Sequence, residues 1–315
     1  MGIAGSQLSV IDLQNGKLGR ITAGFFDSIV CLPPNEVVGL NNSEAVWFSS
    51  GKNLKRSIGW SPQGVLNNTQ IAVSYRFLQK QTSTMFQWHG PLLVGVESLE
   101  DSRNAFNQMA LSANLFPSLG EGPDDFLESI PIRLLKDHKL LIAAGFAMTR
   151  LEQEKPWGLF LIDLQKRNSS PLGPIRKGDE DLSLFVKLTR FAATEDGEII
   201  AGSSGKGIVL MNSKDAKEIS RIPLQEVREV QKLALNDDGT ILAAGLTSKD
   251  GQGRVEIFDV ARGKTLWRTE YAPGVIYGLE FLADDSLVIL QSGSGNNTVS
   301  RRKATDGKIL WLVHV

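Results

Sequence analysis

Short apolar runs alternate with short polar connectors through most of the chain. In the stretch 229–269 the apolar runs cover 230–235, 241–244, 254–260 and 265–267. The connectors are rich in Asp, Asn and Gly. These residues favour tight turns, because Gly accepts positive φ and Asp and Asn hydrogen-bond their own backbone. The stretch therefore predicts four short strands that form one small antiparallel sheet.

The same order of elements recurs in the stretches 130–172, 186–223 and 275–315. In each of them a strand enters a charged turn, and a strand of small or aliphatic residues follows it. Those second strands read LIAAGF, IIAGSS, ILAAGL and VILQSG in the four stretches. Small residues in this place fit a crowded interior, where the strands of neighbouring sheets converge.

The third strand of each stretch gives the period of the repeat. It ends at Asp163, Asn212, Asp259 and Lys303, which are 49, 47 and 44 residues apart. Four-stranded units of this length are typical of β-propellers, in which each unit is one blade. We therefore predict an all-β fold, a single β-propeller domain that spans residues 1–315.

The N-terminal half carries the repeat more weakly. Third strands near positions 12, 47 and 97, added to the four above, predict seven blades. Six blades remain an alternative if residues 64–129 do not form a regular blade. Residues 6–22 look like a third and a fourth strand with little before them, and the last unit is already complete. The sequence therefore leaves open how the ring closes.

Several motifs resemble those of known propeller families. Phe258-Asp259 stands where the WD40 family has Trp-Asp, and so do Ile11-Asp12 and Ile162-Asp163. The phrases GKTLW and DGKILW are similar to the outer strand of quinoprotein (PQQ)-type propeller repeats. The chain contains no Gly-His dipeptide, which WD40 blades use in a buried hydrogen-bond network. The resemblance therefore implies a divergent WD40-like propeller with features of both families.

One segment, at about 100–129, interrupts the repeat. Apolar residues at 106, 109, 110 and 111 (Phe106, Met109, Ala110 and Leu111) are placed at roughly helical spacing, and Pro117 and Gly120 end the pattern. This spacing predicts an inserted loop with a short amphipathic helix. Long insertions in compact domains often carry function, although a loop that only covers a sheet edge explains the pattern equally well.

Aromatic and apolar residues in the insertion and in two connections are our candidate partner contacts. Exposed aromatic side chains often become the anchors of protein interfaces. The candidates are Trp88, Phe106, Met109, Phe116 and Trp157. Trp267 and Trp311 recur at equivalent outer-strand positions, and for them we predict packing between adjacent blades.

Composition and charge exclude several classes of protein. The formal net charge is -1 and 42% of residues are hydrophobic, so the chain is globular and has no basic field for nucleic acid. Cys31 is the sole cysteine, which excludes an intrachain disulfide. No apolar stretch is long enough to span a membrane, and the start shows no signal-peptide pattern. We therefore expect a cytoplasmic protein.

The residues that could carry chemistry are few and scattered. The three histidines show no metal-ligand spacing, and acidic pairs such as Asp237-Asp238 belong to turns. The run GSSGKG at 202–207 is followed by a strand and not by the helix that a phosphate loop needs. We therefore predict no catalytic, cofactor-binding or metal-binding residue, and no cofactor.

These patterns predict a non-enzymatic scaffold that binds protein partners and not nucleic acid. Propellers present broad faces ringed by loops, and such faces need no catalytic constellation. Two alternatives stay open because fold does not determine function. The chain could be a quinoprotein-like propeller that binds a cofactor or metabolite at the central channel, or an extracytoplasmic assembly factor.

Overall fold

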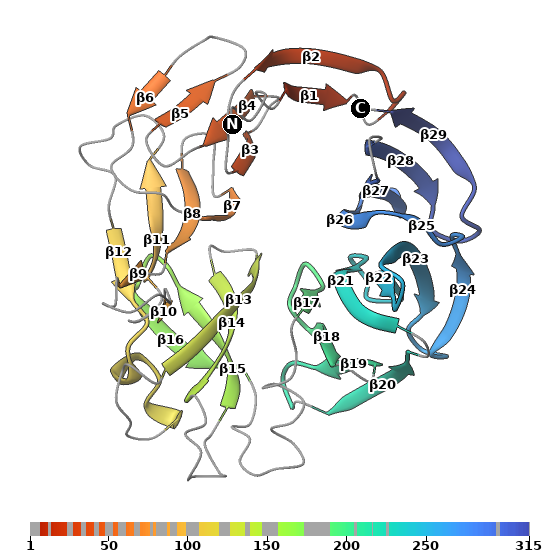
Figure 1. Cartoon of the computed structure of the whole chain (residues 1–315). Coiled ribbons are helices and arrows are strands. Elements are labelled where there is room, and N and C mark those ends of the chain that lie inside the picture. Colours follow the sequence, from red (N-terminus) through yellow and green to blue (C-terminus); the bar gives the residue numbers. More distant parts are fainter. Residues whose placement is uncertain are drawn as a thin grey trace. The chain divides into compact units, whose positions relative to one another are not determined.

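The computed structural model divides the chain into two compact units (Figure 1). Unit 1 comprises residues 1–8 and 20–178, and unit 2 comprises residues 9–19 and 179–315. The structure describes the backbone of residues 7–11, 14–23, 28–32, 36–40, 44–47, 53–55, 61–65, 70–75, 78–79, 87–88, 93–98, 107–119, 127–135, 139–146, 157–172, 190–204, 207–215, 217–224, 227–293 and 297–314.

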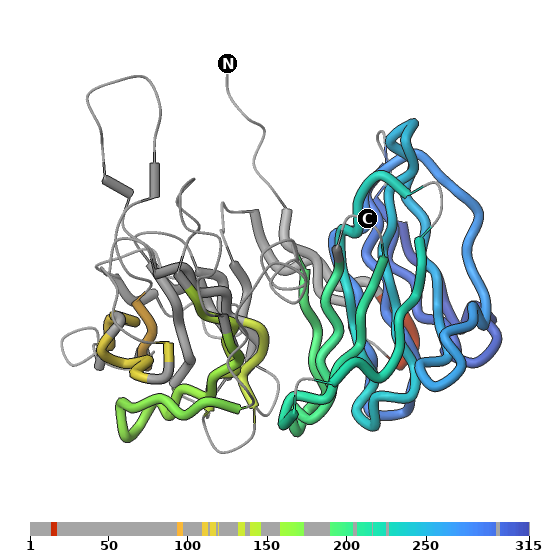
Figure 2. The backbone as a smooth tube through the Cα atoms, turned by 90° about the horizontal axis from the view of Figure 1, so that it is seen from below, coloured from red at the N-terminus to blue at the C-terminus, as the bar shows by residue number. Residues whose placement is uncertain are grey.

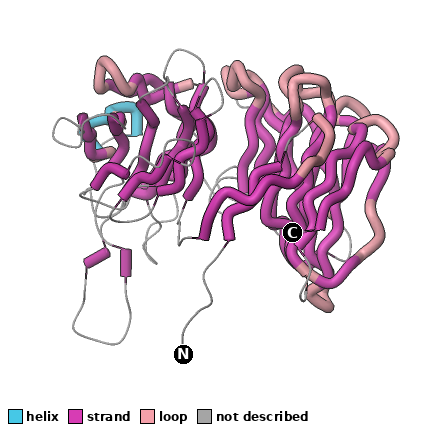
Figure 3. The backbone as a smooth tube through the Cα atoms, turned by 90° about the horizontal axis from the view of Figure 1, so that it is seen from above, coloured by secondary structure: helices cyan, strands magenta, loops and turns pink. Residues whose placement is uncertain are grey.

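Strands dominate both units, as the repeat predicts. Helix is confined, in the described residues, to two 3₁₀ turns, Ala113–Leu115 (η1) and Pro117–Leu119 (η2). Figure 3 shows them as the short cyan segment beside the strands. None of the helices among these residues has the length and apolar character needed to cross a membrane. The prediction of an all-β chain is confirmed.

Unit 1 contains three four-stranded antiparallel sheets. The first consists of β3 (Ser28–Leu32), β4 (Glu36–Leu40), β5 (Glu44–Trp47) and β6 (Asn53–Lys55). The second consists of β7 (Ser61–Val65), β8 (Gln70–Tyr75), β11 (Leu93–Ser98) and β12 (Asn107–Ala110). The third consists of β13 (Leu127–Leu135), β14 (Lys139–Phe146), β15 (Trp157–Asp163) and β16 (Asn168–Pro171). A short pair, β9 (Leu78–Gln79) and β10 (Gln87–Trp88), accompanies them.

Unit 2 holds three further sheets of the same order. The first consists of β17 (Arg190–Ala193), β18 (Ile199–Ser204), β19 (Gly207–Asn212) and β20 (Glu218–Pro223). The second consists of β21 (Val227–Leu235), β22 (Ile241–Ser248), β23 (Gln252–Asp259) and β24 (Lys264–Arg268), and β25 (Ala272–Pro273) pairs with β23. The third consists of β26 (Val275–Phe281), β27 (Ser286–Ser292), β28 (Asn297–Lys303) and β29 (Ile309–His314).

The predicted register of the repeat is confirmed. β15, β19, β23 and β28 are the third strands of their sheets, and they end at Asp163, Asn212, Asp259 and Lys303 as expected. Asp259 accepts a hydrogen bond from the amide of Arg262 (2.9 Å), and Asp163 and Asn212 cap their turns in the same way. The last residue of the third strand is therefore polar in these three sheets because its side chain closes the turn into the outer strand.

The predicted helix near residue 109 is wrong. Residues Asn107–Ala110 form β12, which pairs with β11. Met109 is buried, Ala110 is exposed and Leu111 is buried, which is the two-residue period of a strand. Pairing with β11 satisfies the backbone of this segment as a strand.

The sheets of unit 2 pack face to face (Figure 2). On the β21–β24 sheet, Leu242, Ala244 and Phe258 are buried in a cluster with side chains of the β17–β20 sheet. The residues that alternate with these point to the opposite face. Ala243 and Ile257, for example, are buried against the β26–β29 sheet. Because both faces of the middle sheet are covered, its second and third strands are almost continuously apolar.

Small residues allow the inner strands of adjacent sheets to approach closely. A Cβ added at Gly245 on β22 would lie 2.7 Å from Cγ2 of Ile276 on β26, closer than two carbon atoms can pack. Ser203 occupies the matching position on β18 and is 1% exposed. The small second-strand residues predicted from the sequence are therefore explained by the packing of one sheet on the next.

The two recurring tryptophans pack against turns of neighbouring sheets, as predicted. Trp267 on β24 donates a hydrogen bond from Nε1 to the carbonyl oxygen of Ala304 (2.6 Å), and its ring lies against Gly307. The ring of Trp311 on β29 lies in the same way against Gly16. Gly16 and Gly307 have φ of 72° and 73°, a conformation that favours glycine.

Gly16 belongs to the turn between β1 (Gln7–Ile11) and β2 (Leu18–Ala23), which form a two-stranded sheet. In this turn the amide of Lys17 donates to Asn15 Oδ1 (2.8 Å), as the amide of Lys308 donates to Asp306 Oδ1 (2.9 Å). The turn of the N-terminal hairpin therefore packs on the last sheet, β26–β29. The turn of that last sheet packs in the same way on the sheet before it, β21–β24.

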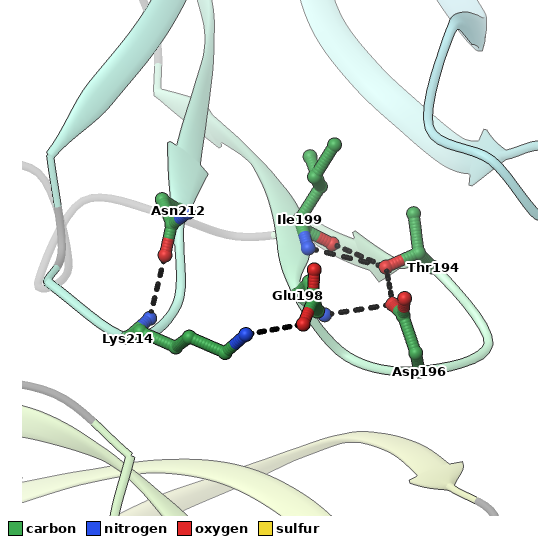
Figure 4. A network of polar contacts seen from close by, with 6 residues as sticks. All are labelled: Thr194, Asp196, Glu198, Ile199, Asn212 and Lys214. Atoms are coloured by element: carbon green, nitrogen blue, oxygen red, sulfur yellow. Dashed lines mark hydrogen bonds and ion pairs between the residues drawn. The ribbon is translucent and has the colours of Figure 1, made fainter.

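Acidic residues of the inner turns bind their own backbone. In the network of Figure 4, Asp196 accepts hydrogen bonds from Thr194 Oγ1 (2.6 Å) and from the amide of Glu198 (2.9 Å). The side chain of Glu198 pairs with Lys214, which lies in the turn after β19. Asp238 and Asp284 accept the matching bonds in the next two sheets. The acidic pairs are therefore explained by turn geometry, as the sequence predicts.

The bonds to Asp238 predict a loss of stability in acid. The hydroxyl and amide of Thr240 hold the pKa of the Asp238 carboxyl below its ordinary value. The stabilisation is therefore fully present above about pH 4 and is lost as the pH falls through the lowered folded-state pKa. We expect Asp238→Ala to reduce the free energy of unfolding at pH 7 by about 0.5–1 kcal/mol, and to flatten its decline between about pH 4 and pH 2.

Urea titrations at several pH values measure this effect. The matched control is Asp237→Ala, because Asp237 is an exposed carboxylate of the same turn. Equal pH dependence in the two variants would contradict the role assigned to Asp238.

A candidate binding groove between two sheets

A groove of about 350 Å³ lies in unit 2 between the end of β20 and the outer strands β23 and β24. Its apolar lining comes mainly from Ile222, Leu224 and Phe258, and its charged lining comes from Arg254, Glu256 and Arg268. The volume is within the range of small-ligand sites, about 300–1,000 Å³.

Strand geometry brings the charged residues together. Arg254, Glu256 and Phe258 occupy every second position of β23, so their side chains lie on one face. Arg268 on β24 pairs with Glu256, and Thr265 pairs with Phe258, which places both on that same face. This is the face that packs on the β17–β20 sheet, and the groove is the part that β20 does not cover.

A largely buried ion pair forms one wall of the groove. Arg254 Nη2 lies 3.0 Å from Glu256 Oε2, and the two side chains are 14% and 8% exposed. Thr265 Oγ1 donates a hydrogen bond to Glu256 Oε1 (2.7 Å). The Arg254 guanidinium lies 4.4 Å from the centre of the Tyr271 ring, a cation–π contact. These contacts hold the guanidinium in a fixed orientation.

Not every hydrogen-bond donor in this wall of the groove has an acceptor. Arg254 Nε is buried and has no hydrogen-bond partner. An unsatisfied buried donor is costly, by about 1–3 kcal/mol, so a bound acceptor would stabilise it. Arg268 is exposed beside the pair and adds a second guanidinium. Two arginines and one glutamate give the lining of the groove a formal charge of +1.

This arrangement suits a ligand that combines an anionic group with an apolar one. Guanidinium groups bind carboxylates through two parallel hydrogen bonds, which gives strength and orientation. No set of three or more potential ligands gathers around a metal position in the residues that the structure describes.

Two of the candidate partner contacts lie in the core and not on the surface. Phe116 is fully buried, and its ring meets that of Phe160 edge-on with centroids 4.7 Å apart. Met109 is 8% exposed and belongs to the same cluster. Leu111, Phe116 and Leu119 pack in the same cluster as residues of the β13–β16 sheet. Met109 and Phe116 are therefore corrected from contacts to core.

The other three candidates are only partly placed. Trp88 is the last residue of β10 and Trp157 the first of β15, and their side chains lie outside the described residues. Phe106 also lies outside the described residues. The groove was not predicted from the sequence, although β23 contains a signal for it. Arg254 and Glu256 are charged residues at alternate positions of a third strand whose other face is apolar.

Comparisons with known proteins bear on the fold. No family model matches the chain, and no curated protein matches it. Among solved structures 798 chains match, which indicates a fold shared by many proteins and so carries no single function. One is entitled "Crystal structure of the eukaryotic initiation factor"; it is 10% identical, with a TM-score of 0.50, and the match covers 99% of this chain and 96% of that chain. At this identity the likeness describes the fold alone.

Proposed function

We propose that the chain is a single WD40-like β-propeller that acts as a non-enzymatic protein-binding scaffold. In the described residues, five four-stranded sheets, one five-stranded sheet and the N-terminal hairpin support seven repeated sheets. The face-to-face stacking in unit 2 is the packing that a propeller requires. A likeness over nearly the whole chain to one solved structure is consistent with a single domain.

The observation that carries the binding role is the groove beside the Arg254–Glu256 pair. Its polar groups hold one another in place, and its charge balance favours an anion. We propose that it binds an extended segment of a partner protein that has an Asp or Glu next to an apolar residue. The carboxylate would pair with Arg268 and Arg254, and the apolar side chain would pack on the half-buried Leu224.

Selection from a random peptide library displayed on phage tests this function. We expect the intact chain to enrich peptides with an acidic residue beside an apolar one, and Arg268→Glu to weaken their binding by about 10-fold or more, because it removes a charge-assisted bond and adds repulsion. The matched control is Arg262→Glu, since Arg262 is exposed in the neighbouring turn and lies outside the groove.

Two results would count against the proposal. One is a selection without acidic peptides, and the other is equal loss of binding in both charge-reversal variants. Trp88, Phe106 and Trp157 remain our proposed second set of partner contacts, and their alanine variants belong in the same binding series.

A further inference from the structure

The outer strands of unit 2 share one packing position, and the groove lies beside one copy of it. Ser220 on β20, Trp267 on β24 and Trp311 on β29 occupy this position. Each of them pairs with the residue two positions before the last residue of its third strand, and a register shift lies directly beside each pair. The repeat therefore identifies Ser220 as the counterpart of the two tryptophans.

A glycine of the following turn faces each of these three side chains. A Cβ added at Gly307 or at Gly16 would lie 2.8 Å or 2.9 Å from the ring of the tryptophan that faces it. At Gly263 the nearest atom to an added Cβ is Ser220 Oγ, at 3.3 Å. All three glycines have positive φ and precede a lysine. The same contact between a turn and an outer strand therefore occurs three times, twice with an indole and once with a serine.

Gly263 belongs to the lining of the groove, together with Phe258 and Thr265. Ser220 is half-buried and Thr265 is exposed. A serine side chain is much smaller than an indole, so the turn at Gly263 is not covered by a ring from β20. At this end the groove therefore lacks the ring that both equivalent contacts have.

We infer that the partner segment bound in the groove carries a tryptophan whose ring lies against Gly263, as the rings of Trp267 and Trp311 lie against their glycines. This inference rests on the function proposed for the groove and adds a second residue to the segment that it binds. Tryptophan buries a large apolar area and is enriched among the residues that dominate interface energies. The ring is expected to supply most of the affinity, and the carboxylate the orientation.

Strand geometry fixes where this tryptophan stands relative to the acidic residue. Side chains of an extended segment point alternately to opposite sides, here to the β20 wall and to the β23–β24 wall. Gly263 and Arg268 both belong to the β23–β24 wall. They are five residues apart, roughly 16 Å along an extended strand. Two or four residues of the segment, together with the reach of the two side chains, span this distance, so the spacing is an even number.

The chain's own tryptophans do not stand in such a pattern. The six are Trp47, Trp60, Trp88, Trp157, Trp267 and Trp311. None of them has an Asp or Glu two or four residues away. These 315 residues therefore contain no segment of the inferred kind, and we assign the tryptophan to the partner.

Fluorescence anisotropy with synthetic nine-residue peptides tests the tryptophan directly. Each fluorescein-labelled peptide has a Glu-Leu pair in a Gly/Ser background and a Trp two, three or four residues before the Glu. We expect the tighter of the two even-spaced peptides to bind the intact chain about 10-fold or more tightly than its counterpart with alanine in place of tryptophan. The peptide with a spacing of three is the matched control and should bind like the alanine counterpart, because its ring faces the β20 wall.

A variant of the chain places an indole in the groove from β20 itself. Ser220→Trp is expected to weaken binding of the even-spaced tryptophan peptide about 10-fold or more and to leave the alanine counterpart unchanged, because the new ring occupies only the place against Gly263. Ile219→Trp is the matched control, since Ile219 is 45% exposed and lies outside the lining of the groove. Thermal melts show whether each variant is folded, and the peptide series needs neither variant.

Two results overturn this inference and leave the proposed function intact. The first is equal binding of the tryptophan peptides and their alanine counterparts, with both still weakened by Arg268→Glu. The second is an equal effect of folded Ser220→Trp and Ile219→Trp on the even-spaced tryptophan peptide. Failure of every acidic peptide to bind would overturn the proposed function together with the inference.

Discussion

Substitution of Gly274 by alanine is expected to be among the most destabilising single changes in unit 2. Gly274 connects β25 to β26 with φ of 124°, a conformation that residues with a Cβ rarely adopt. A Cβ here would overlap the carbonyl oxygen of Ser292 at the end of β27. The carbonyl oxygen is part of the backbone and the added Cβ is bonded directly to it. Neither atom can move aside alone, so the two strands must separate. We expect a loss of about 4 kcal/mol or more.

Gly251→Ala separates the clash from the backbone strain. Gly251 also has positive φ (77°), but a Cβ added there meets nothing within 4 Å. Its alanine variant therefore suffers only the conformational strain, about 1–2 kcal/mol. Urea unfolding of the two variants measures the difference. Equal losses would mean that β25, β26 and β27 do not approach as the structure has them.

Much of the fold of unit 2 could be predicted because its local signals and its packing agree. Turn residues such as Asp238 and Gly239 define where strands begin, and small residues such as Gly245 follow from sheet stacking. The period from Asp259 to Lys303 then fixes the register of the third strands. Prediction from residues alone succeeds where the turn residues, the residue sizes and the repeat period all favour the same structure.

The failures have physical causes as well. Apolar residues at 109 and 111 fit a strand and a helix equally in so short a segment, and only the edge of β11 decides between them. Phe116 is the type of aromatic residue that often anchors interfaces, but it is buried in the core beside Phe160. The groove exists because β20 covers only part of β23. The relative lengths of strands in two different sheets decide how large the uncovered part is.

The place of the N-terminal hairpin also needed three-dimensional information. Asn15-Gly16-Lys17 matches Asp306-Gly307-Lys308 in pattern, but the tryptophan that each glycine meets lies on the preceding sheet. For Gly307 that sheet comes directly before in the chain. For Gly16 it is the last sheet, almost 300 residues away in sequence. The sequence shows the repeat of the turn but not the partner of its first copy.

The second large effect follows from that contact. A Cβ at Gly16 would lie 2.9 Å from Cγ and Cδ2 of Trp311, at a residue whose φ is positive. We expect Gly16→Ala to cost about 2–3 kcal/mol, part from strain and part from the clash. Trp311→Ala removes a half-buried ring and is expected to cost about 2–3 kcal/mol, less than full burial would give.

A double-mutant cycle between these two positions tests the central claim, that the N-terminal hairpin packs on the last sheet. The closest contacts of Gly16→Ala are with the Trp311 ring, and only the 3.1 Å contact with the Trp311 Cβ remains in Trp311→Ala. We therefore predict that the double variant is more stable than the sum of the single losses by about 1 kcal/mol or more. Gly16→Ala with Trp267→Ala is the matched control and should be additive, because Trp267 meets Gly307 instead. Additivity of Gly16→Ala with Trp311→Ala would contradict the contact between the N-terminal hairpin and the last sheet.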